Sequence, residues 1–266
     1  MMSLVTINGV SLVYHDPEGE TRALHNVNLS VEPSEFVVIV GPSGCGKSSL
    51  LSIVAGLIKP SSGEVYVGGE RVTGPSRRIG YMLQHDYLFE WRTILENALL
   101  GLEVRKEKTR ESVAEVRELM RRYGLGGFEN HYPRQLSGGM RQRAALIRTL
   151  AVRPDCLLLD EPFSALDYQT RLRVAEEVYG ILKDENKTVI MVTHDIAEAV
   201  ALADRIVVMT PRPGTIASEH RIRFECAKRT PLTTRRLPEF SGYFNAVWRD
   251  LDSFEGEVQA VGGGEL

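Results

Sequence analysis

Hydrophobic and polar residues alternate along the first forty residues, a pattern typical of β-strands with one buried face. Turn signals interrupt this alternation at HDPEGE (15–20) and VEPSE (31–35). Alternating runs separated by Gly, Pro and Asp are typical of antiparallel strands joined by short turns. The sequence therefore predicts an antiparallel β subdomain at the N-terminus.

The pattern changes at Phe36, where short, continuous apolar runs replace the alternation. Helical stretches separate these runs, as expected for buried parallel strands joined by crossover helices. The fold class predicted is α/β, with a mostly parallel, doubly wound sheet. The predicted strands cover residues 36–40, 156–160, 188–194 and 205–210.

The strand signal disappears between residues 85 and 150, which predicts a helical insertion in a domain that spans 1–225. Within it, residues 103–126 predict one helix with a charged, solvated face that ends at Gly124 and Gly126. The remaining residues, 226–266, are interpreted as a tail with a short amphipathic helix at PEFSGYFNAVWRDL.

Composition excludes several classes of protein. The 266 residues carry a net charge of −3, and no apolar run approaches the about 18 to 20 residues of a membrane span. The three cysteines are far apart, without the spacing of a disulfide framework or a zinc site, and fit a reducing cytosol. The basic stretch 221–236 is short in an acidic chain, so we interpret it as a solvated tail and expect no nucleic-acid partner.

The segment GPSGCGKS (41–48) joins an apolar strand to a helix-like SSLLSIVAGL. Glycines allow successive backbone N–H groups to turn towards phosphate oxygens, and the following helix adds the positive end of its dipole. Lys47 would reach the β and γ phosphates, and the Ser48 hydroxyl would bind Mg²⁺. The residues predicted to bind the nucleotide here are Gly41, Pro42, Ser43, Gly44, Cys45, Gly46, Lys47, Ser48 and Ser49.

A second motif, CLLLDEP, delivers Asp160 and Glu161 at the carboxyl end of an apolar strand, where open α/β sheets bind ligands. We expect Asp160 to hold the metal ion, directly or through water. Glu161 would accept a proton from the water that attacks the γ-phosphate. Taken alone, the two acids have the alternative role of ending a strand.

The segment LSGGMRQRAALIRTLAV (136–152) predicts a helix with Ser137 as its N-cap and Gly138 and Gly139 in the first turn. Such a helix start binds anions, and a side chain at either glycine would keep a phosphate away. A second phosphate site in one chain is redundant unless it binds the nucleotide of a second, identical chain.

In these motifs the sequence resembles the nucleotide-binding subunit of ABC transporters. GPSGCGKS resembles the Walker A motif, LSGGMRQR the signature, CLLLDEP the Walker B motif, SALD (164–167) the D-loop and VTHD (192–195) the H-loop. The resemblance covers about residues 4–225. It implies a head-to-tail homodimer that sandwiches two ATP molecules, with Mg²⁺, between the Walker motifs of one subunit and the signature of the other.

The resemblance assigns three further roles. Tyr14 would stack on adenine, Gln84 would bind Mg²⁺ and the attacking water, and His194 would contact the γ-phosphate and orient Glu161. The alternatives are a packed strand aromatic, a solvent-facing glutamine and a structural histidine. Asp167 would communicate across the dimer, and it also fits as a helix cap. In the turn PSE (33–35) the family usually has a central glycine, so a positive φ would strain Ser34.

The apolar stretch after Gln84 and the end of the chain are most similar to the importer branch for nitrate, sulfonate, taurine, bicarbonate and thiamine-precursor pyrimidines. There Leu88, Phe89 and Trp91 would form an exposed groove for a transmembrane permease subunit, or else belong to the core. This resemblance implies an importer ATPase on the cytoplasmic face of the membrane, acting indirectly with a solute-binding protein. The alternatives are a soluble ABC ATPase not coupled to transport and an exporter.

Overall fold

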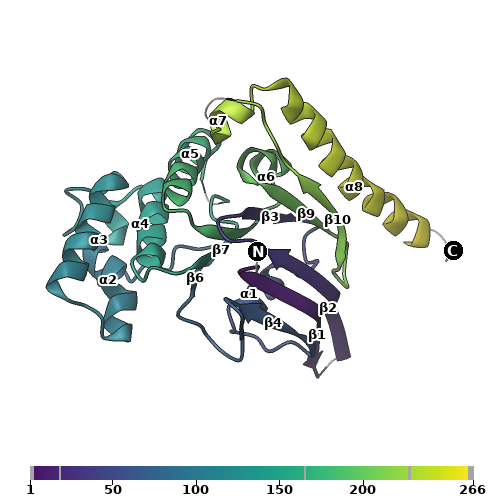
Figure 1. The fold of residues 1–266 in the computed structure, drawn as a ribbon, viewed down its shortest axis with the longest axis horizontal. Helices are drawn as coiled ribbons and strands as arrows, with labels where there is room; N and C mark the ends of the chain where they lie inside the picture. The colour runs from purple at the N-terminus through teal and green to yellow at the C-terminus, as the bar shows by residue number, and fades with distance from the viewer. Residues whose placement is uncertain (1–2, 18, 165, 227–228, 263–266) are drawn as a thin grey trace. The chain divides into compact units, whose positions relative to one another are not determined.

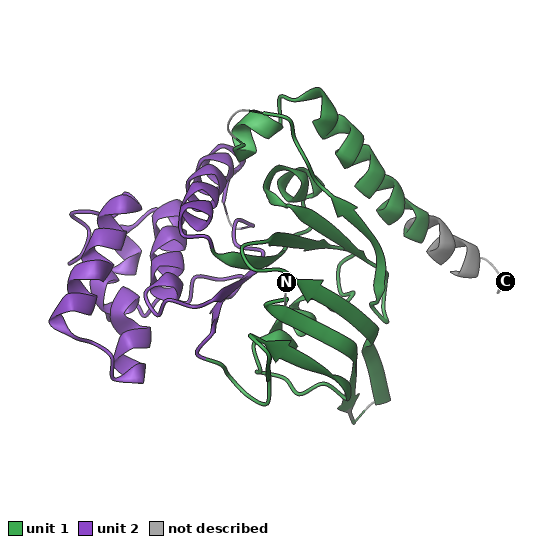
Figure 2. Ribbon diagram, viewed as in Figure 1, with its two compact units in different colours: residues 1–76, 187–266 green, residues 77–186 purple. Residues whose placement is uncertain are grey.

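The computed structural model describes residues 3–17, 19–164, 166–226 and 229–262. The chain divides into two compact units, shown in different colours in Figure 2. Unit 1 comprises Met1–Ser76 and Lys187–Leu266, and unit 2 comprises Arg77–Asn186.

The first part of unit 1 is an antiparallel sheet with the order β2-β1-β4-β5 (Figure 1). Its strands are β1 (Val5–Asp16), β2 (Gly19–Val31), β4 (Ser62–Val67) and β5 (Glu70–Arg71). Val5 and Ile7 of β1 are buried, as the alternation predicts, and a register shift between Ile7 and Val10 precedes the next buried residue, Val10. The predicted antiparallel β subdomain is confirmed, although β4 and β5 were not predicted.

The second part of unit 1 is built on the buried strand β3 (Phe36–Val40), which pairs in parallel with β8 (Thr188–Val192) and β9 (Arg205–Met209). An antiparallel edge strand, β10 (Ile216–Arg221), pairs with β9. Every residue of β3 and β8 is buried, which is why their sequences are apolar without alternation. The helices of this unit are α1 (Lys47–Val54), α6 (Ile196–Leu202), α7 (Pro231–Thr234) and α8 (Pro238–Gly262).

Unit 2 contains the parallel pair β6 (Ile79–Met82) and β7 (Cys156–Asp160) together with a group of helices. The parallel strands of both units confirm the predicted α/β class. The helices are α2 (Ile94–Arg105), α3 (Arg110–Arg122), the 3₁₀ turn η1 (Pro133–Gln135), α4 (Gly138–Leu150) and α5 (Tyr168–Asp184).

The single helix predicted for residues 103–126 is wrong, because the chain forms the end of α2 and then a separate α3. Lys106 ends α2 in the left-handed conformation (φ 58°), and its N–H bonds to the carbonyls of Glu103 and Leu102. Three residues later Thr109 caps α3 and forms a capping box with Ser112. These two caps stop one helix and start the next.

The C-terminal helix is also longer than predicted, since α8 extends over 25 residues instead of about four turns. Figure 1 shows it as one continuous helix leading to the C-terminus. Val247 is fully buried, and Asp250 Oδ2 lies 2.7 Å from His220 Nε2 of β10. Packing and this polar contact hold α8 against the rest of unit 1.

Three further observations concern the backbone at Ser34, the cysteines and the length of the apolar helices. Ser34 adopts a φ of 62°, the positive value that the sequence suggested at that turn. Cys45, Cys156 and Cys226 are free thiols, and burial raises the pKa of Cys156 to about 12. Within the described ranges, no helix is long and apolar enough to cross a membrane.

Candidate functional site

The glycine-rich loop of unit 1 follows β3 and leads directly into α1. Gly44 and Gly46 have φ values of 74° and 104°, which side chains rarely adopt, so glycine is needed at both positions. The Lys47 side chain is buried, and its Nζ donates to the carbonyls of Gly41 (2.8 Å) and Pro42 (2.9 Å). The loop therefore already places an ammonium group beside the exposed N–H groups of a helix start, an arrangement suited to phosphate.

Tyr14 and His194, the other two nucleotide residues expected in this unit, lie on different elements. The Tyr14 ring is 40% exposed, and its hydroxyl lies 3.0 Å from Ser49 Oγ in the first turn of α1. This contact places an accessible aromatic ring beside the phosphate loop. His194 is exposed and lies between β8 and α6. The strand β8 ends at Val192, two residues before the end that the sequence predicted.

In unit 2, β7 delivers Asp160 and Glu161 as the sequence predicts. Asp160 is buried, and the Tyr81 hydroxyl donates to its Oδ2 over 3.4 Å. Glu161 has a φ of 45°, a strained value for this residue type. Gln84 Nε2 donates to Glu161 Oε2 over 3.4 Å, so the structure brings together the two residues expected to handle the attacking water.

The signature segment starts α4 with Ser137 as its N-cap, as predicted, and Ser137 Oγ accepts from the Met140 N–H at 3.4 Å. The glycines that follow differ in role. A Cβ on the buried Gly139 would lie 3.0 Å from Thr170 Cγ2 of α5, a tight contact that favours glycine where the two helices pack. Gly138 is the more accessible of the two.

The D-loop also contains local structure that explains its residues. Ser164 donates through its N–H and hydroxyl to the Glu161 carbonyl, and Ala165 lies outside the described residues. Asp167 is the N-cap of α5 and accepts from the Thr170 N–H at 3.1 Å. Hydrogen bonds with Thr170 lower the pKa of Asp167, so it stays ionised at the positive helix end.

Two arginines of α4 hold the segment after Gln84, which sequence reasoning missed. Arg141 Nε donates to the Asp86 carboxylate (3.1 Å), and Arg148 donates to the carbonyls of Asp86 (2.6 Å) and Tyr87 (2.7 Å). The buried Asn97 of α2 bonds both ways with the Phe89 backbone. These bonds tie residues 86–87 to the signature helix α4 and Phe89 to α2. Arg and Asn inside helical patterns gave no signal of such partners.

The predicted exposed groove of Leu88, Phe89 and Trp91 is wrong for Leu88, which is 7% exposed and belongs to the core. Phe89 is half-buried, and its ring stacks on Trp91 with centroids 4.8 Å apart. Trp91 is 73% exposed. The segment thus presents a supported aromatic pair rather than a row of three apolar side chains.

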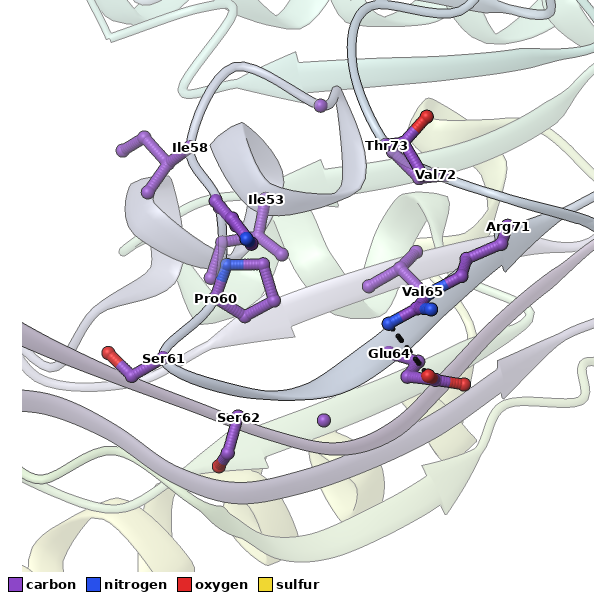
Figure 3. Close-up of a pocket in the computed structure, with 13 residues that line it drawn as sticks. Ile53, Ile58, Pro60, Ser61, Ser62, Glu64, Val65, Arg71, Val72 and Thr73 are labelled. Atoms are coloured by element: carbon purple, nitrogen blue, oxygen red, sulfur yellow. Dashed lines mark ion pairs between the residues drawn. The ribbon is translucent and has the colours of Figure 1, made fainter.

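A pocket of about 570 Å³ lies elsewhere in unit 1, at the end of α1 opposite the phosphate loop. Figure 3 shows Ile53, Pro60 and Val65 on its walls, with Arg71 paired to Glu64 at 2.7 Å. From Lys47 to Ile53 the helix rises about 9 Å, so this pocket is separate from the predicted phosphate site.

The predicted metal ligands are a hydroxyl (Ser48), an amide oxygen (Gln84) and a carboxylate (Asp160). This all-oxygen set fits Mg²⁺, which is bound by few protein ligands together with phosphates and water. The described part of the chain has no group of three His, Cys, Asp or Glu side chains placed for a metal ion.

The comparisons with known proteins agree with these motifs. The family described as ABC transporter matches residues 24–164. The aliphatic sulfonates import ATP-binding protein of Bacillus cereus is 44% identical, over 80% of this chain and 83% of its own. The nitrate import ATP-binding protein of Synechocystis is 41% identical, over 91% and 92%.

A solved dimeric ATP-binding cassette in a post-hydrolysis state, bound to ADP and Pi, is 35% identical with a TM-score of 0.72. The match covers 83% of this chain and 99% of the cassette. The resemblance inferred from the motifs is confirmed: this chain belongs to the ABC transporter family, and it is an ATP-binding cassette with ATPase activity.

Proposed function

We propose that this chain is the ATP-hydrolysing subunit of an importer for a small solute of the sulfonate, taurine, nitrate or thiamine-precursor type. The observation that carries the proposal is the similarity to sulfonate and nitrate import proteins over most of the chain, with every nucleotide motif present. The runner-up, a soluble ABC ATPase not coupled to transport, has no comparable support.

The reaction adds water to the γ-phosphate of ATP. The Lys47 ammonium and the loop N–H groups bind the β and γ phosphates and offset their charge. Glu161 accepts a proton from water as the water oxygen bonds to phosphorus and the β,γ-bridging oxygen leaves with ADP. Gln84, 3.4 Å from Glu161, orients the same water, and His194 contacts the γ-phosphate. Tyr14 stacks on the adenine.

Mg²⁺, held by Ser48, Gln84 and Asp160, would neutralise charge on the phosphates. Because Gln84 Nε2 donates to Glu161, its amide oxygen is the atom available to a cation. Asp160 is buried beside Tyr81, which keeps its carboxylate in one place.

The assembly is a head-to-tail homodimer in which Ser137, Gly138 and Gly139 contact the ATP of the other subunit. Support comes from the dimeric state of the similar cassette and from the capped start of α4, which offers N–H donors without a lysine. The exposed pair Phe89 and Trp91 receives a permease subunit, which places the protein on the cytoplasmic face of the membrane. A solute-binding protein acts through that permease.

Two measurements test the function. Purified protein should hydrolyse ATP, and Lys47→Ala should abolish phosphate release by removing the cation beside the phosphates. Cells lacking the gene should lose uptake of one labelled solute among sulfonates, taurine, nitrate and a pyrimidine precursor, and regain it with the wild-type chain but not with Lys47→Ala. ATPase activity together with normal uptake of all four solutes would favour the uncoupled alternative.

A further inference from the structure

The turn between β9 and β10 lies against the phosphate loop. Because β3 and β9 are parallel neighbours, their carboxyl ends lie side by side. The loop that follows β3 and the turn that follows β9 therefore start at the same end of the sheet. Thr210 closes the turn: its N–H bonds to the Thr215 carbonyl, and its hydroxyl accepts from the Thr215 N–H, both at 3.0 Å.

Arg212 and Gly214 of this turn contact the carbonyl groups of two successive loop residues, Gly44 and Cys45. Arg212 donates through both Nε and Nη2 to the Gly44 carbonyl oxygen, each over 3.2 Å. Gly214 packs on the next carbonyl so closely that a Cβ there would lie 2.0 Å from Cys45 O. Gly214 is itself fixed to β2, because its N–H bonds to the Ala23 carbonyl at 2.9 Å.

In a trans peptide the C=O and the following N–H point in opposite directions. With the Gly44 and Cys45 carbonyls turned towards Arg212 and Gly214, the N–H groups of Cys45 and Gly46 point to the other side. The Cys45 N–H is directed at the Pro42 carbonyl (3.4 Å), which also accepts from Lys47 Nζ (2.9 Å). The phosphate-binding side of the loop is therefore the side opposite the turn.

We propose that Arg212 is a positioning residue for ATP binding: together with Gly214 it holds the outer carbonyls of the phosphate loop so that the Cys45 and Gly46 N–H groups face the phosphates. The inference rests on the proposed ATP site. Without Arg212 the peptide between Gly44 and Cys45 rotates more freely, because Gly44 on its N-terminal side has no Cβ and adopts positive φ. ATP binding must then order that peptide first.

The experiment compares Arg212→Ala and Arg212→Lys with two references. Arg221→Ala removes an exposed arginine from the same hairpin, and Lys47→Ala removes the ammonium group of the loop. Dissociation constants for Mg-ATP and for inorganic tripolyphosphate are measured by displacement of a fluorescent ATP analogue. Measurements at about 0.1 M and about 1 M salt, where the Debye length is about 10 and about 3 Å, distinguish positioning from long-range attraction.

Arg212→Ala should raise the dissociation constants for both ligands, and the KM for ATP, about tenfold, the effect of losing a hydrogen bond from a charged donor. The factor should be the same at both salt concentrations, and kcat should change less than about twofold, because binding is affected rather than the chemical step. Arg212→Lys should recover most of the affinity, and Arg221→Ala should match the wild type.

Other outcomes overturn the proposal. Wild-type affinity in folded Arg212→Ala shows that the loop orders without the arginine, and a factor that vanishes at high salt shows that its charge only attracts the nucleotide. A fall in kcat at unchanged KM shows that a smaller fraction of the variant protein is folded and active. Lower thermal unfolding temperatures for Arg212→Ala and Arg212→Lys would reveal this loss of folded protein. Failure of the wild type to bind ATP better than Lys47→Ala would instead reject the proposed function.

Discussion

Glu161 combines an acidic side chain with a backbone conformation that glycine tolerates better. Glu161, with a φ of 45°, directly follows the buried strand β7, and its carbonyl accepts hydrogen bonds from Ser164. Such strain persists where the surrounding structure fixes it, and it often occurs where a side chain must project towards a ligand. In this chain the Glu161 carboxylate accepts a hydrogen bond from Gln84 Nε2 over 3.4 Å.

Replacing Glu161 by Gln tests the role of that carboxylate. Glu161→Gln keeps the size of the side chain but cannot accept a proton, so ATP should still bind and the dimer should accumulate. Hydrolysis should slow at least about 100-fold. Size-exclusion chromatography with Mg-ATP and a phosphate-release assay measure the two effects. Wild-type turnover in the purified variant would remove Glu161 from the mechanism.

At the same scale, the sequence predicted the positions of the motif side chains better than the contacts that hold the backbone around them. The phosphate loop, Asp160 and Glu161 could be located because each motif ends an apolar strand, and strand ends can be identified from sequence. Arg212 could not, since an exposed arginine in a turn looks like any solvated charge until its bond to Gly44 is known. Gly139 lies in the first turn of α4 as predicted, and its close contact with α5 is a second reason for glycine that the sequence did not indicate.

At the scale of elements, residues 86–91 connect the signature helix with an exposed aromatic pair. Arg141 and Arg148, which lie on α4, donate hydrogen bonds to Asp86. Asn97, which lies on α2, accepts a hydrogen bond from the Phe89 N–H. Burial lowers the pKa of Arg148, although it stays charged at neutral pH because arginine titrates far above that range. Movement of α4 should therefore displace the Phe89–Trp91 pair.

Trp91→Ala tests this surface. Because Trp91 is 73% exposed, its loss should leave folding and the ATPase rate of the isolated subunit unchanged. Assembly with the proposed permease subunit should weaken by about 2 kcal/mol or more if Trp91 is a hot spot. Co-purification measures assembly, with Trp248→Ala on α8 as a control that removes the other exposed tryptophan. If Trp91→Ala unfolds the subunit, the stacking of Trp91 on Phe89 is needed for folding, and the variant does not test docking.

A further prediction concerns the attachment of α8. Burial alone would raise the pKa of Asp250, but hydrogen bonds from Ser218 and His220 outweigh it and lower the pKa. A lowered pKa stabilises the folded protein above the usual value of about 3.9, and this contribution is lost as pH falls through the lower folded value. Asp250→Asn should cost about 1 kcal/mol at pH 7.

Thermal unfolding and proteolysis of α8 measure this loss. The difference between wild type and Asp250→Asn should start to shrink below about pH 4, where the carboxylate of the unfolded chain becomes protonated, and should vanish below the lower pKa of the folded protein. Asp252→Asn, an exposed acid on the same helix, serves as the control. Equal stability of Asp250→Asn and Asp252→Asn at pH 7 would show that packing around Val247 holds α8 without the polar contact.

The sequence predicted the bounds of those elements whose hydrophobic pattern is continuous or strictly periodic. The buried strands β3 and β7 match their predicted bounds because continuous apolar runs in these lengths have few alternatives. The break between α2 and α3 was missed because a lysine, not a glycine, ends α2 in the left-handed conformation. The length of α8 was underestimated, because its polar C-terminal half has no pattern that requires a helix.

At the scale of the whole molecule, the two helix starts that we propose bind phosphate belong to different compact units. The phosphate loop lies in unit 1 and Ser137 in unit 2. One loop with one lysine binds one triphosphate, so the start of α4 is explained if it contacts the nucleotide of a second chain. The sequence alone suggests this arrangement, and mixtures of variant subunits can test it.

The test combines Lys47→Ala, which removes phosphate binding in its own loop, with Ser137→Arg, which blocks the start of α4 with a bulky cation. If Ser137 acts across the dimer, a heterodimer of these two variants has one site with both defects and one intact site, so activity should reappear on mixing. A chain carrying both substitutions, paired with wild type, should instead damage both sites. If each chain serves its own nucleotide, that second heterodimer keeps one good site.

Cooperativity between sites could mask the rescue, so the second mixture decides. The ATPase rate is followed at fixed wild-type concentration while the double variant is added under conditions of subunit exchange, and each single variant is titrated in the same way. Strong inhibition by the double variant, with weaker inhibition by either single variant, supports action across the dimer, because only the double variant damages both sites. An unchanged rate, with heterodimers demonstrated by a tag on one chain, would show that Ser137 serves its own subunit.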